Sequence, residues 1–170
     1  ILAGLIALVF LSLGLTAGSM DASMVDEMQI RVLLDFPTAY TIVASFVLAF
    51  GGLLGVAYGA AIIGADWAWG TIRAIIARGE SRVRYTLVTF GAIALVLALG
   101  ILVTFVLGAG AAIAAAEMAG VGSDGATDPD TLGSLPELLL RTWLGVTQAA
   151  AIGFAIAMLF KSQLAGIGAG

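Results

Sequence analysis

The sequence of residues 85–116 is YTLVTFGAIALVLALGILVTFVLGAGAAIAAA, and it contains no charged side chain. The hydrocarbon core of a bilayer is about 30 Å thick, and about 20 apolar helical residues cross it. Residues 85–116 exceed that length, so we expect this helix to tilt or to project from the membrane at its end. The stretch predicts a transmembrane helix.

Further apolar stretches extend this interpretation along the chain. We expect the remainder of a first span at residues 1–17, complete spans at residues 38–63 and 138–160, and the start of a fifth span at residues 164–170. The predicted fold class is an all-α polytopic membrane protein, a single transmembrane domain over residues 1–170 with four transmembrane helices plus the start of a fifth. Because the first and last stretches look incomplete, we expect the chain to be a fragment of a longer permease-like protein.

The composition supports a membrane protein and excludes several other classes. Hydrophobic residues make up 61% of the 170, charged residues make up 11%, and the mean hydropathy is +1.13. A soluble domain carries about 25% charged residues, so too few polar side chains are present to cover a surface in water. The chain has no Cys and no His, which excludes disulfides, thiolate catalysis, Ser-His-Asp hydrolysis and imidazole-held metals. A net charge of −4 argues against nucleic acid as a partner.

The charges of the connecting loops alternate in sign. Residues 18–37 carry four acids and one arginine, residues 66–84 carry four arginines and two acids, and residues 117–137 carry five acids and no base. Short basic loops stay on the cytoplasmic side of a membrane. We therefore expect the basic loop to be cytoplasmic and both acidic loops to be extracytoplasmic, in the plasma or inner membrane of a prokaryote. The acidic loops lack the spacing of an EF-hand, so no metal site is expected.

The predicted spans offer packing surfaces and few polar groups. Gly51, Gly55 and Gly59 recur at four-residue intervals, so they lie on one helix face, where small residues let two helices approach closely. Gln148 offers an amide at membrane depth, and we expect it to form interhelical hydrogen bonds or, alternatively, to line a translocation path. No Asp, Glu or Lys lies inside a span, whereas ion-coupled transporters usually place ionisable groups there. This pattern favours an energy source outside the spans.

The basic loop, residues 66–84, is the most informative stretch and reads DWAWGTIRAIIARGESRVR. A helix over residues 66–78 would be amphipathic, with arginines on one side and four apolar side chains on the other: Trp69, Ile72, Ile75 and Ile76. Gly79 is suited to end that helix, and Ser81 is suited to cap the next one. The segment predicts either a docking helix for a cytoplasmic partner or a basic loop that lies against anionic lipid.

The pattern Asp66-x-x-x-Gly70-Thr71-Ile72-Arg73, followed by Ile75-Ile76-Ala77-Arg78 and Ser81-Arg82, resembles the acid-x-x-x-Gly-Thr-Leu-Arg…Ser-Arg signature of ATP-binding-cassette (ABC) permeases of the type-2 membrane-domain family. Here Asp stands where Glu is commoner, and Gly-Glu replaces a frequent Pro before Ser-Arg. The resemblance implies a coupling helix that sits against a cytoplasmic ATPase subunit. It implies docking roles for Asp66, Gly70, Thr71, Arg73, Ile76, Arg78 and Arg82.

The function implied by the resemblance is that of the permease subunit of an ABC exporter, working in the bilayer as a homo- or heterodimer. The chain itself would hold no catalytic residue and no cofactor, because ATP and magnesium would bind the partner ATPase. The arginines would form charge-assisted hydrogen bonds to that partner, and the isoleucines would fill an apolar groove in it. Alternatively, the apolar side lies in lipid and only the charged side meets the ATPase. An ion-coupled secondary transporter or channel and a non-transporting membrane anchor subunit are the other candidate functions.

Overall fold

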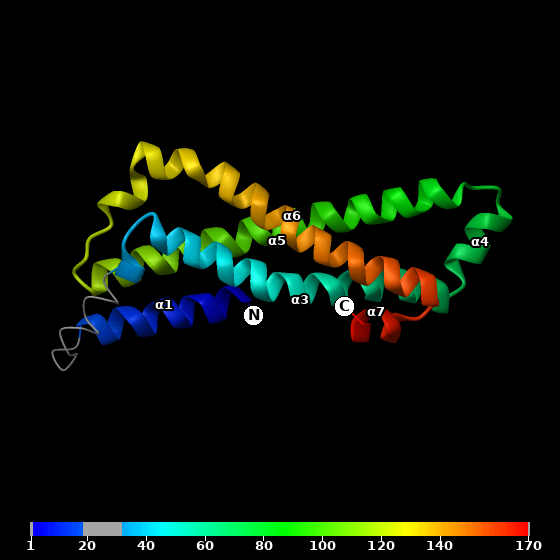
Figure 1. The fold of residues 1–170 in the computed structure, drawn as a ribbon, viewed down its shortest axis with the longest axis horizontal. Coiled ribbons are helices and arrows are strands. Elements are labelled where there is room, and N and C mark those ends of the chain that lie inside the picture. Colours follow the sequence, from blue (N-terminus) through cyan, green and yellow to red (C-terminus); the bar gives the residue numbers. More distant parts are fainter. Residues whose placement is uncertain (1, 19–31, 170) are drawn as a thin grey trace. The chain divides into compact units, whose positions relative to one another are not determined.

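The computed structural model describes residues 2–18 and 32–169, and these form helices joined by short connections (Figure 1). In chain order the elements are α1 (Leu2–Gly18), α3 (Thr38–Ala68), α4 (Thr71–Ala77), α5 (Arg82–Met118), the 3-10 helix η1 (Asp124–Thr127), α6 (Pro129–Phe160) and α7 (Gln163–Ala169). No β-strand occurs within those residues. The predicted all-α fold class is confirmed.

Three helices are long and apolar enough to cross a membrane. They are α3, α5 and α6, with 31, 37 and 32 residues. At 1.5 Å per residue their lengths are about 46, 56 and 48 Å, more than the hydrocarbon core of a bilayer. The chain is therefore a membrane-embedded protein. Helix α1 has 17 residues and a length of about 26 Å, shorter than the other three, and residues 1–17 were predicted as the remainder of a span.

The connection between α5 and α6 is shorter than the predicted loop of residues 117–137. Helix α5 continues to Met118, and α6 already begins at Pro129. Proline suits the first position of a helix because its missing N–H would have no partner there. The Asp128 carbonyl accepts the first bond of α6, from the Leu132 N–H at 2.9 Å. Pro136 lies inside α6, so the second part of the predicted loop belongs to a helix.

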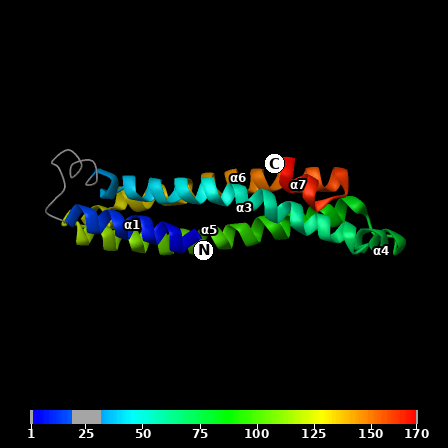
Figure 2. The same cartoon turned by 90° about the horizontal axis from the view of Figure 1, so that it is seen from below.

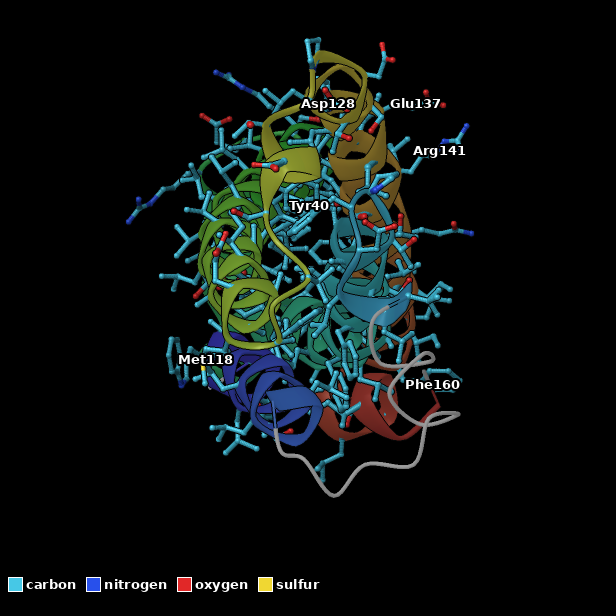
Figure 3. All side chains as sticks on the ribbon, turned by 90° about the vertical axis from the view of Figure 1, so that its left-hand side faces the viewer. Tyr40, Met118, Asp128, Glu137, Arg141 and Phe160 are labelled. Carbon is cyan, nitrogen blue, oxygen red and sulfur yellow. The ribbon has the colours of Figure 1, made fainter. Side chains whose placement is uncertain are left out.

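The chain divides into two compact units, and the first comprises residues 1–47 and 101–142. In it, the Tyr40 hydroxyl donates a 3.2 Å hydrogen bond to the Ala126 carbonyl of η1. The Tyr40 ring also packs against Phe36 and Phe105, with ring centroids 4.8 and 5.8 Å away. Figure 3 shows Tyr40 beneath the η1 connection. These contacts hold the start of α3, the second half of α5 and η1 together.

The second unit comprises residues 48–100 and 143–170. Its core is a cluster of buried apolar side chains from four helices: Ala60, Ile63, Ile72, Ile93, Ala150, Phe154 and Ala157. The Trp143 indole N–H donates a 2.9 Å hydrogen bond to the Ala94 carbonyl and so joins α6 to α5. In this unit α4 lies next to the C-terminal end of α3 and the N-terminal end of α5, and α7 folds back beside α6 (Figures 1 and 2).

Candidate functional site

The amphipathic segment begins with a break between two helices. Helix α3 runs through Asp66 to Ala68, and α4 starts only at Thr71. Between them Gly70 has φ 72° and ψ 12°, a left-handed conformation that favours glycine because a Cβ is strained there. The predicted single helix over residues 66–78 is therefore wrong at its start. Trp69 is 81% exposed in the turn, so it does not extend the apolar side of α4.

The end of α4 agrees with the predicted stop and cap. Gly79 has φ 83°, and its N–H donates to the Ile76 carbonyl at 3.0 Å, while the Glu80 N–H donates to the Ile75 carbonyl at 3.3 Å. This pair of bonds is a Schellman motif, which satisfies carbonyls left free at a helix end. The Arg84 N–H then points to the Ser81 hydroxyl at 3.5 Å. Helix α4 is thus a separate seven-residue helix with defined limits.

The apolar side of α4 packs against its own chain. Ile72 is 6% exposed and belongs to the core cluster of the second unit, with Ile63, Ile93 and Phe154. Ile76 is half-buried against the same cluster. Ile72 is therefore covered within the chain, and a docking role for the half-buried Ile76 stays a prediction. Ile72 is covered because short connections keep α4 beside the ends of α3 and α5, whose side chains cover its apolar side first.

A hydrogen bond joins the two helices that flank α4. The Tyr85 hydroxyl donates to the Asp66 carboxylate at 2.5 Å. In the structure Asp66 is half-buried and accepts this hydrogen bond, and its predicted docking role stays a prediction. Tyr85 was not predicted from the sequence, because nothing in its local pattern indicates that it lies opposite a residue 19 positions earlier.

The outer side of α4 and the start of α5 are basic and exposed. Arg73, Arg78 and Arg82 are exposed, and none of the three forms a salt bridge within the described residues. Arg84, by contrast, lies 3.8 Å from the Glu80 carboxylate. A guanidinium group presents several donors in one plane and suits carboxylates and phosphates. The surface is therefore a basic, exposed face joined to two membrane-spanning helices.

No known protein family, curated protein or solved structure matches this chain. The role of α4 thus rests on its own residues and on the motif that they form. Of the remaining residues predicted for docking, Gly70 has open space around it, so it is required for backbone conformation. Thr71 is half-buried at the first position of the helix.

The glycines of α3 lie at a helix-helix contact in the second unit. A Cβ added to Gly55 would lie 3.0 Å from the Val146 carbonyl oxygen of α6, and one added to Gly59 would overlap the Ala150 carbonyl. Gly51 is half-buried, and it is its neighbour Gly52 whose added Cβ would face Ala149, at 3.9 Å. The close approach therefore involves the second and third glycines of the predicted stripe.

The other predicted residues are dispersed. Gln148 is exposed on α6, outside the core cluster, and its place in a translocation path stays a prediction. Across residues 2–18 and 32–169 no group of three or more acidic side chains gathers as a metal site would. In the acidic connection, Glu117 accepts from Ser123 and Glu137 pairs with Arg141. Most of the predicted loop of residues 18–37 lies outside the described residues.

Proposed function

We propose that this chain is the membrane-embedded permease subunit of an ABC exporter, and that α4 is the helix on which a separate ATPase acts. The observation that carries the proposal is the two-sided character of α4. Its inner side is anchored to the spanning helices through Ile72, and its outer side presents Arg73 and Arg78 to the solvent. The acid-x-x-x-Gly-Thr-Ile-Arg pattern at the same place supports the assignment.

The anchors of α4 suit it to transmit force. Ile72 packs α4 against side chains of α3, α5 and α6, and the Tyr85–Asp66 hydrogen bond joins α3 to α5. A push on α4 would therefore move the ends of the spanning helices together rather than displace a loose loop. Packed cores transmit such displacements because they are dense and poorly compressible.

The polar groups of the spanning helices favour an external energy source. The hydroxyls of Ser45, Thr86 and Thr142 donate to carbonyls four residues earlier in their own helices. Such local bonds leave them poorly suited to hold a coupling ion, whose sites in membranes usually contain ionisable side chains. ATP hydrolysis in a partner supplies the energy without such a site.

The test is a search for a Walker-type ATPase encoded beside this chain, then co-purification of the two proteins and measurement of the rate of ATP hydrolysis. We expect Arg73→Glu to abolish a charge-assisted hydrogen bond worth about 1.5–3 kcal/mol, which weakens binding by about 10- to 150-fold. The matched control is Arg84→Glu, because Arg84 is exposed but already pairs with Glu80. Protease protection of the spans would show that both variants insert into the membrane.

Two results would contradict the proposal. One is an Arg73→Glu protein that still binds and stimulates the ATPase like the unaltered chain. The other is purified chain in liposomes, without any ATPase, that moves a substrate along an ion gradient, which would favour a secondary transporter.

A further inference from the structure

A cavity of about 290 Å³ lies beside α4, inside the second unit. Part of its wall is apolar or aromatic and comes from Trp67, Ile72, Ile75, Ile76 and Met158. The rest includes the cationic side chains of Arg73, Arg82 and Lys161. No carboxylate is among the described residues that line it. The cavity thus has a cationic part and an apolar part, so it is complementary to an anionic amphiphile.

Lys161 holds an unusual backbone conformation at the edge of this cavity. Its φ is 52°, whereas the other described residues with positive φ are glycines: Gly70, Gly79, Gly120 and Gly122. The Ser162 N–H donates to the Ala157 carbonyl at 3.2 Å. Lys161 therefore lies at the position where a glycine commonly ends a helix. Lysine is unfavourable there, and such residues concentrate at functional sites. The Lys161 ammonium lies 5.2 Å from the centre of the Trp67 ring. Both side chains line the cavity, so the positive charge lies at its wall.

Trp67 supplies a second observation at the same cavity. Its indole N–H is buried and has no hydrogen-bond partner. Buried donors are nearly always satisfied, so an unpaired one indicates a missing acceptor. Because Trp67 lines the cavity, an oxygen atom of a bound ligand would satisfy this group.

We propose that the cavity binds the phosphate group of an anionic phospholipid. Arginine and lysine are the side chains that most often bind phosphate, and basic pockets at the ends of membrane helices bind anionic headgroups. The phosphate would lie among Arg73, Arg82 and Lys161, and the first part of the acyl chains would lie against the isoleucines and Met158. The site does not require an ATPase partner, so its test is independent of the proposed function.

The test is native mass spectrometry of the full chain in a nonionic detergent, with phosphatidylglycerol or phosphatidylcholine added. We expect the chain to retain phosphatidylglycerol more strongly. Each cation near an anionic lipid contributes to the free energy of binding. Arg82→Gln and Lys161→Gly should therefore each lower the affinity for phosphatidylglycerol by about fivefold. The control is Arg78→Gln, which removes another exposed charge next to α4 that does not line the cavity and should have little effect.

Lys161→Gly separates a binding defect from a folding defect. Glycine accepts the left-handed conformation better than lysine does, so this variant should unfold at the same or a higher temperature while it binds less lipid. Equal affinity for the two lipids would overturn the proposal, as would an equal loss in Arg78→Gln and Arg82→Gln. Displacement of the lipid by inorganic phosphate alone would also overturn it, because a soluble anion would then be the ligand.

Discussion

The Tyr85 hydroxyl donates a 2.5 Å hydrogen bond to the Asp66 carboxylate, and this bond connects the last turn of α3 with the first turn of α5. Helix α4 lies between these two turns in the sequence, so the bond closes the segment that carries the basic face. The connection from α3 to α5 contains two glycine turns, at Gly70 and Gly79, and the hydrogen bond holds the two ends of this connection together. The position of α4 therefore depends on residues outside α4 itself.

Tyr85→Phe should destabilise the protein because it removes the donor and leaves a half-buried carboxylate without it. The expected loss in the free energy of unfolding is about 1–2 kcal/mol, measured by denaturant titration in mixed micelles. Tyr58→Phe is the matched control, since Tyr58 is 37% exposed on α3. Equal stability of Tyr85→Phe and the unaltered chain would show that the bond contributes nothing.

Ile72→Ala should release α4 from the core of the second unit. Truncation of a buried isoleucine costs about 2–5 kcal/mol because apolar contacts are lost and a cavity remains. We expect faster trypsin cleavage after Arg73 and Arg78, since a detached helix is more accessible to protease. Ile75→Ala, at a half-buried position, should accelerate cleavage less. The assigned anchor would be wrong if the two variants were cleaved at the same rate.

Gly59→Ala should weaken the contact of α3 with α6. The added Cβ would overlap the Ala150 carbonyl oxygen, and overpacking of this kind costs about 1–3 kcal/mol. Gly100→Ala is the control, because a Cβ there meets nothing within 4 Å and alanine favours the helix by up to about 1 kcal/mol. The two substitutions should therefore shift the unfolding free energy in opposite directions, and a shift in the same direction would refute the packing argument.

Labelling of single cysteines would test the topology directly, because the native chain contains no Cys. Ala74→Cys on α4 and Asp128→Cys before α6 both replace exposed residues. By the positive-inside rule, we expect a membrane-impermeant thiol reagent added to intact cells to modify Cys at position 128 and not at position 74. In inverted vesicles the result should reverse. Modification of position 74 from the outside would contradict both the topology and the ATPase proposal.

Local signals predicted much of the candidate site. The long uncharged stretches predicted α3, α5 and α6, and Gly79 and Ser81 predicted where α4 ends and α5 begins. Gly70 was singled out through the motif, but its role as a helix break was not expected, since Asp66 to Ala77 has helical periodicity on both sides of it. The loop predicted for residues 117–137 was too long, because α6 begins at Pro129 and includes Pro136.

By itself, the sequence determined that this is a helical membrane protein with a short amphipathic and basic element between two spans, because length, charge and turn chemistry are local properties. The tertiary structure decided which surface covers that element. Periodicity shows that Ile72 and Ile76 share a side, but only packing shows that their own bundle occupies it. In the same way, the pairing of Asp66 with Tyr85 and of Lys161 with Trp67 arises from helices that meet in space at positions distant in the chain.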